Sequence, residues 1–144
     1  MGARHASREA ALQVLYLCEV GRADPDLALE TYFAEHQPDA EPGLRAFTSA
    51  LVRGVVESRT ALDALVGAHA TNWRVERLAL IDRLILRLGA WELQQTPDTP
   101  AAVVLDEAIE LARTFGTDDS PGFVNGVLDG IRKKLGETRE RENA

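Results

Sequence analysis

The chain has 144 residues, about the size of one domain, and its 45% apolar and 27% charged residues argue against global disorder. No apolar run reaches the roughly 18–20 residues of a membrane helix, and the single cysteine, Cys18, excludes an internal disulfide. The net charge of −7 argues against a nucleic-acid ligand unless cations gather locally. The N-terminus lacks a secretory signal, so we expect a cytoplasmic protein.

Nearly every segment repeats its apolar residues with the 3.6-residue period of an amphipathic helix, and strand-like alternation is almost absent. The pattern therefore predicts an all-α fold of about seven helices. These helices cover about residues 4–20, 25–36, 44–69, a short segment capped by Asn72, 79–95, 100–115 and 121–135. Residues 137–144 are polar and predict a frayed tail on a single domain spanning 1–144.

Proline, glycine and capping residues set the expected helix boundaries. Gly21 ends the first helix, and Asp24 followed by Pro25 begins the second. A capping residue followed by proline also predicts where the sixth and seventh helices begin, with caps at Thr99 and Ser120. Gly116 and Gly136 are the expected ends of those two helices.

Catalytic and cofactor-binding motifs are absent from the sequence. It contains no phosphate-binding glycine loop, no HExxH and no GxSxG, and its three histidines fall on different elements. Cys18 lies on the apolar stripe of the first helix and is expected to be a small core residue. We therefore expect neither a metal nor a cofactor, and a binding protein rather than an enzyme.

The first helix begins with cations that extend its apolar stripe. Arg4 and Arg8 stand four residues apart on one face, and the stripe continues through Val14 and Leu15. We expect these arginines to project past the body of the protein, where they and the helix N-terminus can hold phosphates. The alternative is a solvated helix start without a ligand.

The seventh helix places an aromatic residue beside glycines. Phe123 sits about 100° from the centre of the apolar stripe and shares that flank with Gly126, Gly130 and Lys134. A partly exposed ring beside open backbone and a lysine is a platform on which an unpaired base can stack. The alternative is that Phe123 packs under a neighbouring helix and that the glycines permit close helix contact.

The fifth helix is apolar nearly all round, which is typical of a central helix or of one that touches a partner. Asp82 stands on its second apolar side with Leu86, and Tyr16 lies off the core stripe of the first helix. An acid in an apolar patch together with an amphipathic aromatic suits a protein interface, so we expect these residues to contact a partner. The alternative for Asp82 is an ion pair within the chain.

Four stretches closely resemble the NusB family of bacterial transcription antitermination factors. They are SREAALQVLY at 7–16, LRLGAWEL at 86–93, DEAIELARTFG at 106–116 and FVNGVLD at 123–129. The resemblance covers essentially the whole chain in order. FVNGVLD, preceded by DDS and placed behind the EAIELA helix, is its most specific part.

This resemblance implies two small helical bundles packed together, binding to the boxA element of ribosomal RNA leader transcripts, and a partner, NusE, from the small ribosomal subunit. With RNA polymerase and other Nus factors, such a complex supports transcription of ribosomal RNA operons. The RNA-contacting positions of the family map onto Arg4, His5, Arg8, Asp119, Ser120, Phe123 and Asn125. Its NusE-binding face maps onto Tyr16, Glu76 and Asp82.

One departure and two alternatives accompany this resemblance. Relatives often carry several arginines where this chain has RHASRE, so we expect weaker RNA binding without NusE. A NusB-like domain also occurs in an rRNA cytosine methyltransferase, although the chain ends at Ala144 without an α/β domain. A structural homodimer, paired through an exposed apolar face, is the second alternative.

Overall fold

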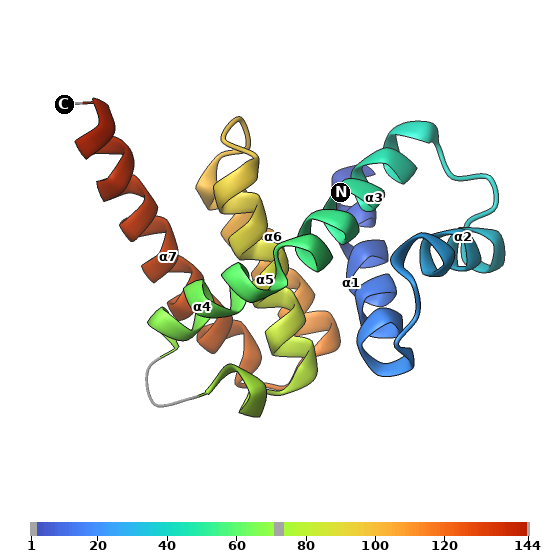
Figure 1. The fold of residues 1–144 in the computed structure, drawn as a ribbon, viewed down its shortest axis with the longest axis horizontal. Helices are drawn as coiled ribbons and strands as arrows, with labels where there is room; N and C mark the ends of the chain where they lie inside the picture. The colour runs from blue at the N-terminus through green and yellow to red at the C-terminus, as the bar shows by residue number, and fades with distance from the viewer. Residues whose placement is uncertain (1–2, 71–73, 144) are drawn as a thin grey trace. The chain divides into compact units, whose positions relative to one another are not determined.

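The computed structural model describes residues 3–70 and 74–143 of the chain (Figure 1). These described residues form seven α-helices and one short 3₁₀ helix, and none of them lies in a strand. The predicted all-α fold is therefore confirmed. The chain divides into two compact units, Met1–Glu57 and Ser58–Ala144. None of the helices in the described ranges has the length and apolar character needed to cross a membrane.

The first unit contains α1 (Ala3–Gly21), α2 (Pro25–His36) and α3 (Pro42–Glu57). α1 packs mainly against α3 and also against α2. The start of α2 follows the predicted capping, because the Leu27 amide donates a hydrogen bond of 3.1 Å to the Asp24 side chain. α1 ends at Gly21 as predicted, although it is Arg22 that takes the left-handed backbone conformation, with φ 51°.

The prediction of one long helix over about residues 44–69 is wrong, because the structure has two helices there, separated at Ser58. α3 ends at Glu57, and α4 (Arg59–His69) begins the second unit. Neither glycine nor proline marks the break, so the apolar period continues across it. A serine hydroxyl competes with the backbone for hydrogen bonds and weakens a helix, but this is too weak a signal to predict an end.

The second unit contains α4, the 3₁₀ helix η1 (Val75–Arg77), α5 (Leu80–Gln95), α6 (Ala101–Phe115) and α7 (Ser120–Asn143). α5 packs against α4, α6 and α7, so it is the central helix that its all-round apolar pattern indicated. A Cβ at Gly89 would lie 2.6 Å from Leu128 Cδ1, which explains why a glycine lets α7 approach. Arg87 binds Asp63 of α4 through two hydrogen bonds of 2.7 and 3.0 Å.

The C-terminal tail is helical, so the predicted end at Gly136 and the frayed segment after it are wrong. α7 continues to Asn143. A single glycine costs an exposed helix only about 1 kcal/mol against alanine, and the tail supplies an anchor. Arg139 Nη2 donates a hydrogen bond of 3.1 Å to the Leu93 carbonyl. The predicted cap Asn72 lies outside the described residues, and η1 is the short helix that follows it.

Candidate functional site

The first group of predicted RNA contacts surrounds one aromatic ring in the first unit. The guanidinium carbon of Arg4 lies 4.4 Å from the centre of the Phe47 ring, and that of Arg8 lies 5.6 Å from it. Both distances are those of cation–π contacts. His5, on the same turn, pairs through Nε2 with Glu9 Oε1 at 2.8 Å. The start of α1 therefore gathers two guanidinium groups around one aromatic ring.

The two arginines differ in their access to solvent. Arg4 is exposed, whereas Arg8 is only 3% exposed. The prediction that both project past the body of the protein is therefore wrong for Arg8. The helical period places both on one face, but it does not show that Phe47 of α3 packs against that face. Arg4 is the arginine of this pair that a phosphate can reach.

The second group lies at the start of α7, in the second unit. Thr117 and Ser120 form a capping turn, in which the Thr117 amide donates to the Ser120 hydroxyl at 3.0 Å and the Ser120 amide donates to the Thr117 carbonyl at 3.1 Å. Ser120 is only 1% exposed, and its predicted contact with RNA stays a prediction. Its hydroxyl shapes the turn that carries the exposed Asp119.

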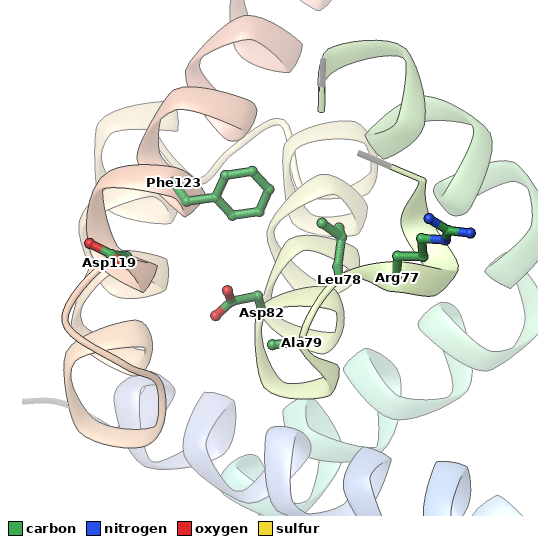
Figure 2. A pocket seen from close by; sticks show the side chains of 6 residues that line it. All are labelled: Arg77, Leu78, Ala79, Asp82, Asp119 and Phe123. Atoms are coloured by element: carbon green, nitrogen blue, oxygen red, sulfur yellow. The ribbon is translucent and has the colours of Figure 1, made fainter. Parts of the chain in front are cut away.

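A cavity of about 230 Å³ opens between the start of α7 and the start of α5 (Figure 2). Phe123 and Asp119 border it from α7, and Asp82 borders it from α5 (Figure 2). Leu78 and Ala79, which directly precede α5, complete the apolar part of its lining, and Arg77 stands at its edge. The structure thus gathers three of the predicted site residues, Asp82, Asp119 and Phe123, around one opening.

The glycines beside Phe123 have two different surroundings. A Cβ at Gly130 would lie 2.9 Å from His69 Nδ1, so this glycine permits close packing of α7 on α4. Apart from its two chain neighbours and the backbone of its own helix, a Cβ at Gly122 or Gly126 would have no atom of the described residues within 4 Å. The helix-contact alternative therefore applies to Gly130, and the open-backbone alternative applies to the glycines that flank the ring.

The remaining predicted residues do not line this cavity. Asn125 and Glu76 are exposed, and neither borders the opening. Leu86 has 0% exposure and belongs to the core, so its expected place on an exposed face of α5 is wrong, and its predicted contact with a partner stays a prediction. Tyr16 is 42% exposed, and Leu17 beside it is also exposed.

Cys18 departs from its expected place in the core, because its side chain is only half-buried. Burial is the main cause that raises the pKa of its thiol above the usual range, and the carboxylates of Asp24 and Glu19 add to it. A raised pKa leaves less thiolate, the nucleophilic form. Among the residues that the structure describes, no three His, Cys, Asp or Glu side chains gather into a metal-binding group.

Sequence reasoning missed Arg77, Leu78 and Phe47. Arg77 and Leu78 follow a segment with no clear period, and Phe47 is one of several apolar residues on a helical stripe. Arg77 and Leu78 reach the cavity, and Phe47 reaches Arg4, only because helices pack together in the fold. Local sequence patterns do not show such packing. In chemical terms, the second unit offers a ring, an apolar wall and carboxylates around one opening, and the first unit offers a fixed guanidinium.

Comparisons with known proteins agree on one family. The sequence model of the NusB family matches residues 5–133. The transcription antitermination protein NusB of Sorangium cellulosum is 48% identical over 94% of this chain and 96% of its own. The solved structure of T. maritima NusB has a TM-score of 0.84 and 34% identity over 90% of each chain. A structure of antitermination factors NusB and NusE in complex with dsRNA has a TM-score of 0.84 and 25% identity, covering 93% of this chain and 98% of the other.

Proposed function

The chain belongs to the NusB family, and from that membership we propose that it is a transcription antitermination factor that binds RNA. The proposed ligand is an unpaired strand of the boxA type in ribosomal RNA leader transcripts. NusE is the proposed protein partner, since a relative has been solved with NusE and RNA. RNA polymerase and other Nus factors complete the proposed assembly, and its compartment is the cytoplasm.

The Phe123 ring carries this proposal. The ring is partly exposed at the mouth of a cavity, and Gly122 and Gly126 leave the helix surface beside it bare. Base–aromatic stacking contributes roughly 1–3 kcal/mol per base and requires a base that is not paired. Arg4, held over Phe47, is the proposed phosphate contact in the first unit.

The proposed NusE contact lies on α1. Tyr16, Leu17 and Val20 are large apolar residues that the structure leaves exposed. Aromatic and apolar side chains exposed together are typical of the centre of a protein interface. A second copy of this chain is the competing occupant, because the homodimer stays an untested prediction. Light scattering with and without NusE distinguishes the two: a dimer that NusE leaves intact would contradict the proposed contact.

A titration of a fluorescent boxA-like strand tests the RNA proposal, with NusE present at saturation. We expect Phe123→Ala to lower the affinity about tenfold, because the stacking surface is lost. Phe123→Tyr keeps the ring and restores most of the affinity. Arg4→Gln weakens binding, whereas Arg53→Gln, which removes an exposed charge that pairs with Asp26, leaves it unchanged.

Equal affinities of the wild type and of Phe123→Ala for this strand would overturn the proposed RNA site. A thermal unfolding curve for each variant checks that the substitution has not simply unfolded the second unit. If Arg4→Gln and Arg53→Gln weaken binding alike, the effect is one of overall charge and not of the cationic group at the start of α1.

A further inference from the structure

A second cavity of the second unit lies far along α7 from Phe123. It has a volume of about 110 Å³ and is lined by the turn after α5, the start of α6 and the later part of α7. Figure 1 shows that turn at the end of the unit opposite the start of α7. With a helical rise of about 1.5 Å per residue, Arg132 and Arg139 stand roughly 13 and 24 Å along α7 from Phe123. This cavity is therefore separate from the one beside Phe123.

Two guanidinium groups line this second cavity. Arg132 and Arg139 stand two turns apart on one face of α7. Asp129 accepts hydrogen bonds of 3.0 and 2.6 Å from Nε and Nη2 of Arg132. The Leu93 carbonyl accepts one of 3.1 Å from Arg139 Nη2. A guanidinium carries five N–H donors, so these contacts hold both groups in place and leave further donors for an anion.

The start of α6 adds neutral donors to the same cavity. Its N-cap is Pro100, and no side chain caps the helix. Thr99, the cap that the sequence predicted, instead lines the cavity. The amides of Ala101 and Ala102 reach no acceptor in the described part of the chain. Such amides at a helix start donate readily to an anion, but here they only supplement the two arginines.

The charges around the cavity favour an anion, although the whole chain is acidic. No acidic side chain is among the described residues that line it. Asp129 is shared between Arg132 and Lys133, so one carboxylate faces two cations, and Arg139 adds a third. Asp98 lies on the neighbouring turn, where it is exposed and does not line the cavity. The net local charge is therefore positive.

We propose that this cavity binds a phosphate group, held by Arg132, Arg139 and the amides at the start of α6. The donors come from two helices, which suits the tetrahedral oxygens of a phosphate better than the two coplanar oxygens of a carboxylate. The cavity is small beside the roughly 300–1,000 Å³ of pockets that hold drug-sized ligands, so one such group fills it. Inorganic phosphate and the backbone of an RNA strand both supply this group, and the site does not depend on base stacking at Phe123.

Inorganic phosphate, titrated at constant ionic strength and followed in the amide NMR spectrum of the full chain, tests the site. We expect saturable shifts of the Ala101 and Ala102 amides. Arg132→Gln and Arg139→Gln should each weaken phosphate binding about tenfold, because each removes charge-assisted hydrogen bonds. Lys133→Gln is the matched control: it removes a neighbouring charge of α7 outside the cavity and should leave the affinity unchanged.

Ala101→Glu separates loss of the site from loss of the fold. A carboxylate in the first turn of a helix favours the helix, but here it repels a phosphate. We expect this variant to lose phosphate binding while its thermal unfolding temperature stays the same or rises. Shifts that do not saturate, shifts that persist in Ala101→Glu, or equal affinity for acetate would each overturn the proposal.

Titration of a boxA-like strand in phosphate-free buffer, with NusE at saturation, distinguishes the two sources of the phosphate. If Arg132→Gln and Arg139→Gln weaken RNA binding and Lys133→Gln does not, the site holds a phosphate of the RNA. If the arginine variants lose inorganic phosphate but keep their RNA affinity, the site serves the free ion. Both results support a phosphate site, and neither depends on the outcome of Phe123→Ala.

Discussion

Phe47 places one aromatic ring against two guanidinium groups, 4.4 Å from Arg4 and 5.6 Å from Arg8. An exposed arginine has many rotamers, and binding a phosphate requires that it settle in one of them. The ring reduces this cost by holding Arg4 near the position in which it is used. In the proposed function, Phe47 therefore acts as a positioning residue for Arg4.

We expect Phe47→Leu to lower affinity for a boxA-like strand about two- to fivefold, since a cation–π contact at an exposed site contributes roughly 0.5–1 kcal/mol. Phe47→Tyr keeps the ring and the affinity. A double-mutant cycle with Arg4→Gln, measured by fluorescence anisotropy, gives the coupling. If Phe47→Leu weakens binding as much in the Arg4→Gln background as in the wild type, the ring does not act through Arg4.

Cys18 is a second residue whose surroundings determine its chemistry. Burial, with the carboxylates of Asp24 and Glu19, raises the pKa of its thiol, so the thiolate forms at higher pH than in a free cysteine. We expect alkylation by iodoacetamide to be slow at neutral pH and to keep accelerating beyond the usual titration range of a thiol. Asp24→Asn keeps a side chain able to cap α2 and should shift that rate profile to lower pH; an unchanged profile would contradict the electrostatic contribution.

Among the elements, α7 combines glycines of opposite function. Gly130 lets His69 pack against the helix, whereas Gly126 has open space where a side chain would be. Glycine destabilises an exposed helix by about 1 kcal/mol relative to alanine, so the bare surface at Gly126 costs stability without improving packing inside the chain. In the proposed function, close approach of RNA to this surface is the physical reason for that cost.

We expect Gly126→Ala to raise the free energy of unfolding by about 0.5–1 kcal/mol and, at the same time, to weaken RNA binding. Gly136→Ala is the matched control, because a Cβ there also meets no atom of the described part of the chain and the position lies further along α7. It should stabilise the protein equally and leave RNA binding unchanged. Urea unfolding and RNA titration on the same samples measure both effects, and unaltered affinity in Gly126→Ala would contradict an RNA contact at this surface.

The predictability of each element depended on whether its signals were local. Apolar period and capping residues predicted α1, α2 and most of α5, because these features act within one or two turns. The break at Ser58 and the extension of α7 past Gly136 were missed, since neither has a strong local marker. The extension is supported by a hydrogen bond from Arg139 to a carbonyl of α5, a contact that no helical period reveals.

The candidate site was also predictable only in those features that depend on local sequence. The flank position of Phe123 indicated a partly exposed ring, and the structure bears this out. The cavity beside it was not predictable, because Leu78 and Asp82 come from another part of the chain and meet α7 only in the folded unit. Arg8 and Leu86 were assigned to the surface for the same reason: burial depends on packing partners that the sequence does not identify.

The whole molecule carries a net charge of −7, so its long-range field repels RNA. Binding must therefore rely on a small number of cations, together with stacking that does not depend on charge. Arg4 and Arg77 are exposed arginines next to the two candidate groups. For a single strand, each phosphate contact contributes about 0.7 to the slope of log affinity against log salt.

With NusE held at saturation and salt varied from about 50 to 300 mM, we expect Arg4→Gln and Arg77→Gln each to lower the slope of log affinity against log salt by about 0.7. Phe123→Ala should shift the whole line to weaker binding with its slope unchanged, because stacking releases no counterions. Arg53→Gln controls for overall charge, since this arginine pairs with Asp26 and lies at neither candidate group. A slope that falls equally in all three arginine variants would show that RNA responds to the total charge and not to these two contacts. A slope that falls in Phe123→Ala would show that the ring acts by positioning phosphates.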